Sequence, residues 1–239
     1  MSAQLESDDK ATVIKPVAEV EGKRRKDREA QTPLDEMEIA KELPIMPLPD
    51  TVIYPHIVAP LLVTDDNLIK LIDEALVGDR VIGVVTLRDS EQEPEPENLY
   101  DVGSAVAIAR MFKLPDGQMQ LLVQGVARIR IKDYTQTHPF LKASVERLVD
   151  KVEDTVELEA LTRNALNLFR KIVNFAPYLP DELFIAAMNV DEPNDLSDFL
   201  SANINMSTAE KQELLEQLDV KERLKRLTVF LNREVEVLE

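Results

Sequence analysis

The sequence predicts an α+β chain in which a small, partly closed β-barrel precedes an all-helical bundle ending in a long helix. Residues 42–150 show short apolar segments of period two separated by turn residues, whereas residues 151–239 show a helical period. A domain boundary is therefore expected near residue 150. Residues 1–41 are polar, and their few hydrophobic residues follow no pattern, so we predict a disordered tail of mixed acidic and basic charge.

Composition excludes several classes of function. Among the 239 residues there is no Cys, which rules out a disulfide framework, a thiolate metal site and a cysteine nucleophile. The net charge of −17 repels phosphate backbones, so nucleic acid is not an expected partner. No apolar run approaches the length of a membrane helix, and the acidic N-terminus "MSAQLESDDK" is unlike a signal peptide. A cytoplasmic protein with no membrane partner is expected.

The tail contains one basic run, "KRRKDR" at 23–28. Such a run can contact nucleic acid or an acidic partner. Acidic residues flank it on both sides, so a solvated tail is the more frequent outcome for this pattern.

The stretch "ELPIMPLPDTVIYPHIVAPLLV" at 42–63 combines strand-like residues with five prolines: Pro44, Pro47, Pro49, Pro55 and Pro60. A central strand does not tolerate that density, because proline donates no ladder hydrogen bond. We therefore expect the prolines at edges, bends and turns, with "HIVAPLLV" as an edge or bulged strand.

The next segments complete the predicted barrel. "DDNLIKLIDEALVGD" at 65–79 has one apolar helical face, and Asp65 or Asp66 can cap it. "RVIGVVTL" and "LKASVERLV" read as strands, and "PDG" at 115–117 has the chemistry of a hairpin turn. Gly125 is expected at a bulge or bend. In "ARIRIK", Ile129 and Ile131 alternate with Arg128, Arg130 and Lys132. About six short strands around one helix predict the partly closed barrel.

The helical region is expected to form about five helices. An apolar stripe consists of Leu158, Leu161, Ala165, Leu168, Phe169 and Ile172. Capping boxes are predicted at Asp154/Glu157, Ser207/Glu210 and Asp219/Glu222. In the last helix, Leu224, Leu227, Leu231 and Leu238 begin a seam like that of a coiled coil. This helix is either the end of a fragment or an attachment point for a partner.

Catalytic motifs are not found in the sequence. It has no GxxxxGK[ST] phosphate loop and no GxSxG nucleophile elbow. His56 and His138 lack a second ligand at metal spacing, and Glu95 and Glu97 fit a solvated loop better than a cation site. No catalytic residue, metal or cofactor is predicted for this chain.

The hairpin "MFKLPDGQM" is the candidate binding site. It gathers Met111, Phe112, Leu114 and Met119 around one turn. Side chains in such a position most often plug the end of a barrel. The functional alternative is an adaptable apolar surface, because methionine is flexible and suits promiscuous binding of apolar segments.

Several stretches together resemble a known family. "LPIMPLPDTVIYPHIVAPLLV" is similar to the opening of the N-terminal domain of Lon proteases, which are ATP-dependent serine proteases. "EPENLYDVGSAVAIARMFKLPDGQMQLLVQGVARIRI", "PFLKASVERL" and the stretch from "LPDELF" to the final "VEVLE" resemble later parts of that domain in the same order. The resemblance covers residues 42–239. The family usually has Arg at the position of Pro49 and often has Gly at the position of His56. These two departures concern the geometry of the local turns.

The resemblance implies a PUA-like β domain and a helical bundle that recruit unfolded or damaged proteins and support homo-oligomer assembly. The family's ATPase module and Ser–Lys protease module are not in this chain, so the chain itself is not expected to be an enzyme. The last helix would couple the module to the ATPase ring. The alternative hypothesis is a stand-alone Lon-domain adaptor or ligand receptor with no protease attached. An independent enzyme would need a catalytic site that none of the motifs in this sequence indicates.

Overall fold

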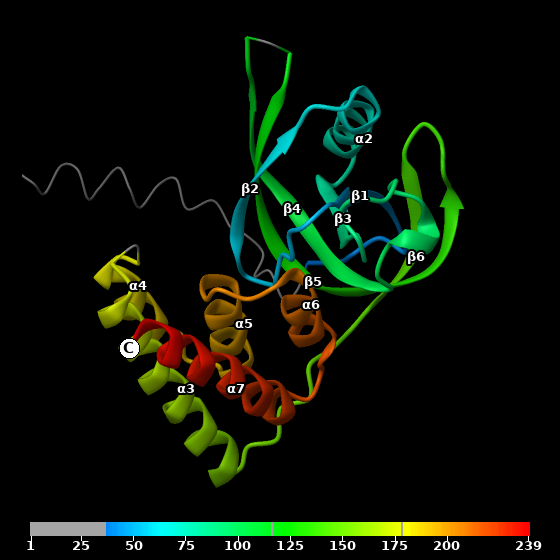
Figure 1. The fold of residues 1–239 in the computed structure, drawn as a ribbon. Helices are drawn as coiled ribbons and strands as arrows, with labels where there is room; N and C mark the ends of the chain where they lie inside the picture. The colour runs from blue at the N-terminus through cyan, green and yellow to red at the C-terminus, as the bar shows by residue number, and fades with distance from the viewer. Residues whose placement is uncertain (1–36, 116, 178) are drawn as a thin grey trace, which may run out of the picture. The chain divides into compact units, whose positions relative to one another are not determined.

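The computed structural model describes residues 37–115, 117–177 and 179–239 (Figure 1). Most of the predicted tail, including the basic run at 23–28, lies outside the described residues. Residues 37–41 have no regular secondary structure, but their backbone contacts the barrel. The Lys41 carbonyl accepts a hydrogen bond of 2.8 Å from Val145 N–H, and the Met37 carbonyl accepts one of 3.0 Å from Arg147.

Six strands within these residues build the β part, as predicted. They are β1 (Glu42–Leu48), β2 (Val58–Val63), β3 (Val81–Thr86), β4 (Val102–Lys113), β5 (Met119–Gln136) and β6 (Leu141–Arg147). Their order is β2-β5-β4-β3-β1-β6, and a further pairing joins β5 to β6. This pairing closes β5, β4, β3, β1 and β6 into a ring, and β2 is added outside it on β5. The predicted partly closed barrel is confirmed.

Helix α2 (Asp66–Val77) supplies part of the barrel core. Asp65 is its N-cap, and its carboxylate accepts hydrogen bonds from the backbone N–H groups of Asn67 and Leu68. Leu71, Ile72 and Ala75 are buried against side chains from the strands. The predicted helix and its cap are therefore confirmed.

Prolines occupy two different kinds of position. Pro49 and Pro55 lie in a bend and a turn, and Pro60 lies in the edge strand β2, as predicted. For Pro44 and Pro47 the expectation of an edge, bend or turn is wrong. Both lie inside β1, which has β3 and β6 as its neighbours in the sheet. Pro44 pairs with β6 alone and Pro47 with β3 alone. Each half of β1 is thus paired mainly on one side, so each proline nitrogen, which has no hydrogen to donate, can face the side without a partner strand.

Gly125 allows two chain segments to touch. The register of β4 against β5 shifts beside it, which confirms the predicted irregularity. A Cβ atom at Gly125 would lie 2.1 Å from the Tyr54 carbonyl oxygen and 2.9 Å from the Pro55 Cα. Any side chain here would push the Tyr54–Pro55 backbone away from β5.

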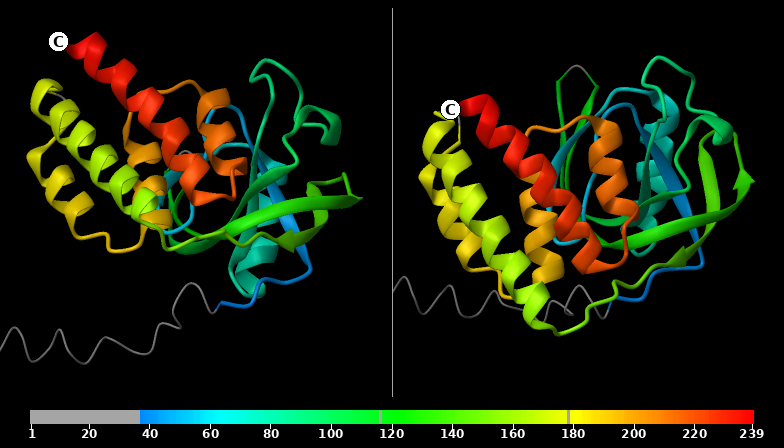
Figure 2. Two further views of the ribbon diagram at one scale, coloured as in Figure 1. Left: turned by 90° about the horizontal axis from the view of Figure 1, so that it is seen from below. Right: turned by 60° about the horizontal axis from the view of Figure 1, so that its bottom comes forward.

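Five helices in the described part of the chain follow the barrel, in agreement with the prediction. They are α3 (Val156–Phe175), α4 (Asp181–Met188), α5 (Pro193–Asn203), α6 (Thr208–Glu216) and α7 (Val220–Leu238). Helices α3 and α7 lie side by side in both views of Figure 2, and the predicted stripe on α3 faces the core. Strands give way to helices between Arg147 and Val156. A domain boundary near residue 150 stays a prediction, because residues 37–239 form one compact unit.

Of the three predicted capping boxes, one is confirmed, one is present only as an N-cap, and one is wrong. Ser207 and Glu210 form a reciprocal capping box on α6, and Asp219 accepts a hydrogen bond from Glu222 N–H on α7. Helix α3 is capped by Thr155, whose hydroxyl accepts from Leu158 N–H, and not by Asp154. Thr155 has extended backbone dihedrals, so the helix begins one residue later than the sequence pattern suggested.

Candidate functional site

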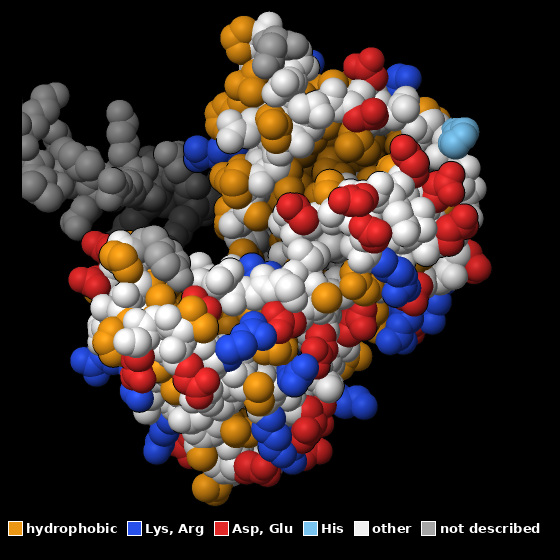
Figure 3. All heavy atoms as spheres, in the orientation of Figure 1, with side chains coloured by type: hydrophobic (Ala, Val, Ile, Leu, Met, Phe, Trp, Pro, Cys, Tyr) orange, Lys and Arg blue, Asp and Glu red, His pale blue; other side chains and the backbone are white. Residues whose placement is uncertain are grey.

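The exposed face of β2, β5 and β4 carries apolar side chains; we call it the outer face. Strand residues alternate between the two sides of a sheet. Leu61, Val63, Met119, Leu121 and Val123 therefore point into the barrel core, whereas Val58, Pro60 and Leu62 of β2 point outward. Leu122 of β5 and Phe112 of β4 also belong to the outer face. Figure 3 shows hydrophobic side chains along the side of the molecule formed by β2 and the β4–β5 hairpin.

The outer face leaves much apolar surface in contact with solvent. Leu62 is 61% exposed, and Val58 and Phe112 are each 52% exposed. Leu62 lies opposite Gln120 of β5, which in turn lies opposite Phe112 of β4, so the two hydrophobic side chains lie in one row across the strands. A partner that covered this row would remove its apolar surface from water.

The four predicted hairpin residues divide between the two sides of the sheet. Met119 is buried in the barrel core and Met111 is half-buried against it, where the plugging alternative expects them. Phe112 is exposed on the outer face, and Leu114 is half-buried at the turn, where its N–H donates to the Gln118 carbonyl. The structure therefore brings Met111 and Met119 together and directs Phe112 away from them.

Val58 and Leu62 are the outer-face residues that sequence reasoning missed. The signal was present in "HIVAPLLV", where Val58, Pro60 and Leu62 are spaced two apart. In an edge strand with one covered side, that spacing directs all three to solvent.

The leucines proposed for coupling lie inside the chain's own bundle. Leu224, Leu227 and Leu231 are fully buried in the helical core, and Leu238 is half-buried at its end. Most of the apolar surface of the predicted seam is therefore covered by other helices of the same chain. The solvent side of α7 exposes Val229 and Val237.

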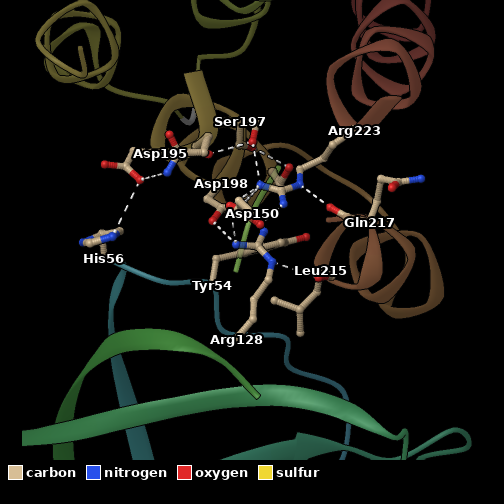
Figure 4. A network of polar contacts seen from close by, with 12 residues as sticks. Tyr54, His56, Arg128, Asp150, Asp195, Ser197, Asp198, Leu215, Gln217 and Arg223 are labelled. Carbon is tan, nitrogen blue, oxygen red and sulfur yellow. Dashed lines mark hydrogen bonds and ion pairs between the residues drawn. The ribbon is translucent and has the colours of Figure 1, made fainter. Parts of the chain in front are cut away.

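A buried cluster of four charged residues joins the barrel to the helices; we call it the charged junction (Figure 4). Arg128 comes from β5, Asp198 from α5, Arg223 from α7, and Asp150 from the segment between β6 and α3. Arg128 and Asp198 form a bidentate pair with N–O distances of 2.9 and 2.5 Å. Arg223 lies 2.5 Å from one oxygen of Asp150. Cross contacts of 3.3 Å join Arg128 to Asp150 and Arg223 to Asp198.

Backbone carbonyls complete the hydrogen bonding of both guanidinium groups. Arg128 Nε donates to the Leu215 carbonyl at 2.9 Å, and Arg223 Nε donates to the Gln217 carbonyl at 2.7 Å. Arg128 is 3% exposed and Arg223 is fully buried. Burial alone would lower the pKa of Arg128, but the charge and hydrogen bonds of Asp198, together with Asp150, raise it above its usual value. Two arginines and two aspartates thus form a neutral, hydrogen-bonded cluster.

Neutral polar contacts surround the junction. The Tyr54 hydroxyl donates to the Lys211 carbonyl at 2.7 Å, and burial followed by the Asp198 charge raises the pKa of Tyr54. The Gln212 amide of α6 donates to the Val102 carbonyl of β4 at 2.8 Å. Val52, Tyr54 and Val102 of the β part also belong to the helical core. The arrangement can hold barrel and helices together, but its burial leaves it unsuited to bind a ligand.

The sequence pattern around the junction was only partly informative. The side chains of Arg128 and Ile129 point to opposite faces of β5, as the alternation in "ARIRIK" predicted. At Arg128, however, helices cover the face that was expected to be exposed. Arg223 lies on the buried side of α7 with Val220 and Leu227, at helical spacing. A charged residue within an apolar stripe was the available signal for a buried ion pair.

The histidines and acidic residues are potential metal ligands. No group of three or more potential ligands is placed to hold a metal ion in the ranges that the structure describes. His56 Nε2 lies 3.6 Å from an Asp195 carboxylate oxygen. His56 has φ = 63°, a left-handed conformation that suits glycine. In addition, none of the described helices is long and apolar enough to cross a membrane.

Comparisons with known proteins agree on one family. A model of the family described as the ATP-dependent protease La (LON) substrate-binding domain matches residues 42–233. The Lon protease of Dictyoglomus thermophilum is 44% identical over 202 residues, covering 84% of this chain and 26% of that protein. The Lon protease of Roseiflexus castenholzii is 40% identical over 210 residues, covering 87% and 26%. The chain thus spans about a quarter of the length of these curated relatives.

Solved structures show the same fold. The N-terminal domain of a Mycobacterium avium complex Lon protease matches with a TM-score of 0.67 and 23% identity, covering 80% of this chain and 98% of that one. A Lon N-terminal domain protein from Xanthomonas campestris matches with a TM-score of 0.60 and 20% identity, covering 80% and 99%. These likenesses confirm the predicted α+β architecture.

Proposed function

Because the chain belongs to the family of the ATP-dependent protease La (LON) substrate-binding domain, we propose that it recognises substrates for a Lon-type protease by binding exposed apolar segments. The substrates would be unfolded or damaged proteins, which expose segments that folded proteins bury. The match over residues 42–233 confirms the family resemblance of the sequence.

The observation that carries this proposal is the exposed row of apolar side chains on the outer face. Burying one such side chain contributes about 1.5–3 kcal/mol before the cost of ordering the bound segment. One module therefore binds weakly and without strict sequence preference, which suits a receptor for many substrates. Assembly of several modules in a homo-oligomer would raise the effective concentration of sites.

Bond cleavage and unfolding belong, in this proposal, to ATPase and protease modules of the full-length enzyme, and the chain contributes binding. Helix α7 is held to the barrel through Arg223 and the charged junction, so it is suited to transmit the position of the barrel to those modules. We place the protein in the cytoplasm, with neither nucleic acid nor membrane as a partner, since its charge of −17 opposes both phosphate backbones and anionic lipid surfaces.

Binding to an unfolded protein and to its folded form tests the proposal. The full chain should bind a reduced and alkylated, permanently unfolded protein and should not bind the native form of the same protein. The Leu62→Ser, Phe112→Ser double variant should bind at least about tenfold more weakly, because it removes two exposed apolar contacts. Fluorescence anisotropy with the labelled unfolded protein measures both.

Val156→Ser is the matched control, because Val156 is also an exposed hydrophobic residue but lies at the start of α3. It should bind like the unchanged chain, and so should a chain that lacks residues 1–41. Equal or absent binding to the unfolded and folded forms would refute the proposal.

A further inference from the structure

The outer edge of β2 has backbone groups that can pair with another strand. β2 is the first strand of the sheet order and pairs with β5 on one side, and no other strand pairs with it in the described part of the chain. Gly125 N–H donates to the Ile57 carbonyl at 2.9 Å. Hydrogen-bonded and non-bonded positions alternate along an antiparallel pair, so Ala59, Leu61 and Val63 bond to β5. The backbone N–H and C=O groups of residues 58 and 62 then face the free edge.

We propose that this edge binds an extended apolar segment of a substrate as an additional β-strand, with Val58 and Leu62 forming the backbone hydrogen bonds. The inference rests on the proposed function and specifies how the segment is held. Main-chain hydrogen bonds would give affinity that does not depend on the substrate's sequence. Such sequence independence suits a receptor for many unfolded proteins.

The side chains of the same residues select apolar segments. Val58 and Leu62 are the exposed hydrophobic residues of β2, and their side chains lie on the outer face beside the position of an added strand. Residues directly opposite each other on neighbouring strands share a face and lie within contact distance. A segment with apolar residues at alternate positions would therefore bury Val58 and Leu62 while its backbone pairs with theirs.

Pro60 indicates that the occupant is a different chain and not a second copy of this one. Pro60 lies between the two bonding residues and offers a carbonyl but no N–H group. An incoming strand with ordinary residues loses one hydrogen bond at this position. Two copies of β2 paired antiparallel about Pro60 would place two donorless residues opposite each other and lose both central bonds. The proline thus weakens self-pairing more than it weakens substrate binding.

The test uses the full chain with a peptide of alternating Val and Thr residues and with the same peptide N-methylated at its interior amides. The unmethylated peptide should slow hydrogen exchange of the Val58 and Leu62 amides, as measured by NMR. Methylation should weaken binding at least about tenfold, because it removes the backbone donors and blocks approach to the edge. Equal affinity for the two peptides, or no protection of these two amides, would overturn the proposal of an added strand.

Pro60→Val restores the missing donor and should tighten peptide binding about fivefold, the effect of one net hydrogen bond. Pro94→Val, in the exposed loop before β4, is the matched control and should leave the affinity unchanged. If Pro60→Val instead forms dimers in sedimentation without binding the peptide more tightly, the edge serves a second copy of the chain and the inference is wrong.

The proposed function and the added strand fail in different ways. Absence of binding to both the peptide and the unfolded protein would refute both. Suppose instead that the chain binds the unfolded protein, binds both peptides equally well and leaves the Val58 and Leu62 amides unprotected. That result would preserve the proposed function and refute the added strand.

Discussion

Proteins usually bury apolar residues and expose charged ones, and two regions of this molecule depart from that rule. The charged junction buries charged residues, and the outer face exposes apolar ones. The junction buries Arg128 and Arg223, whereas the outer face exposes Val58, Leu62 and Phe112 to solvent. In the junction, each charge has an oppositely charged partner and each guanidinium group donates to a backbone carbonyl. The exposed side chains lack such compensation within the described residues. The junction is therefore an interaction completed inside the chain, whereas the outer face stays exposed to solvent, as the proposed function requires.

A short segment of the chain joins the two regions. Tyr54 lies beside the junction, and the chain continues from it through Pro55 and His56 to β2 of the outer face. Gly125 holds that connection against β5. Substitutions in either region should therefore show whether stability and binding are separate properties of this protein.

The largest effect on stability is expected from Asp198→Ala in the junction. This change leaves the Arg128 guanidinium buried without its bidentate partner, so the free energy of unfolding should fall by about 3–5 kcal/mol. Asp101→Ala is the control, because Asp101 pairs with Arg88 at the surface and should contribute less than about 1 kcal/mol. Urea titration followed by circular dichroism measures both. Equal losses for the two variants would show that burial of the junction has no energetic consequence.

Arg128→Met combined with Asp198→Leu sharpens the same test. Replacing a whole buried pair by apolar residues of similar volume removes the unpaired charge, so the double variant should be more stable than Asp198→Ala. The Asp150–Arg223 pair stays intact in this variant. If the double variant is the less stable one, the junction contributes mainly through attraction between its charges.

Gly125→Ala should produce the next largest loss, about 1–3 kcal/mol, because its Cβ would lie 2.1 Å from the Tyr54 carbonyl oxygen. Gly78→Ala is the matched control, since the nearest atom to its Cβ is 3.7 Å away and its stability should change by less than about 0.5 kcal/mol. Thermal unfolding compares the two variants. A similar melting temperature for both would mean that the Tyr54–Pro55 segment moves without cost.

Glu210 gives a smaller effect that depends on pH. Hydrogen bonds from Arg233, and from Ser207 in the capping box, lower the pKa of Glu210 from 4.5 to about 2, although burial acts in the opposite direction. A lowered pKa in the folded state stabilises above pH 4.5, and this contribution is lost as the pH falls toward 2. Because solvent screens the pair, the contribution is at most about 1 kcal/mol.

Glu210→Gln tests this linkage. The difference in unfolding free energy between the unchanged chain and Glu210→Gln should be largest at pH 5–7 and should shrink as the pH approaches 2. Urea titrations at several pH values measure it. A difference that does not vary with pH would indicate that Glu210 acts only through the geometry of the α6 cap.

The smallest effect on stability is expected on the outer face. Leu62→Ser should change the free energy of unfolding by less than about 0.5 kcal/mol, because the side chain is mostly exposed already. The same variant should still bind the unfolded protein more weakly. A large loss of stability with unchanged binding would show that Leu62 of the outer face stabilises the fold and does not contribute to binding.

Much of the architecture was predictable because it depends on local patterns. The period-two segments, the "PDG" turn and Gly125 predicted the strands and their irregularity, and Asp65, Ser207 and Asp219 predicted three of the helix starts. Thr155 was missed because two adjacent residues could each cap α3, and backbone dihedrals decide between them. The order of motifs also predicted the family, which the match over residues 42–233 confirms.

The candidate site was less predictable because it depends on which side of each strand is covered. Met111, Phe112 and Met119 are neighbours in sequence, and the register of β4 against β5 places Phe112 on the outer face and the other two against the barrel core. Through pairing of β2 with β5, more than fifty residues away along the chain, Leu62 reaches the same row as Phe112 and Val58 reaches the same face.

The alternation of side chains, the helical stripes and the succession of a β region and a helical region follow from local sequence patterns, because these properties arise between residues a few positions apart. The burial of Arg128 with Asp198, the packing of Leu224 in the chain's own core and the lack of a second neighbour strand for β2 among the described residues became visible only in the folded chain. These features depend on which distant segments cover a given surface, and no local pattern records that.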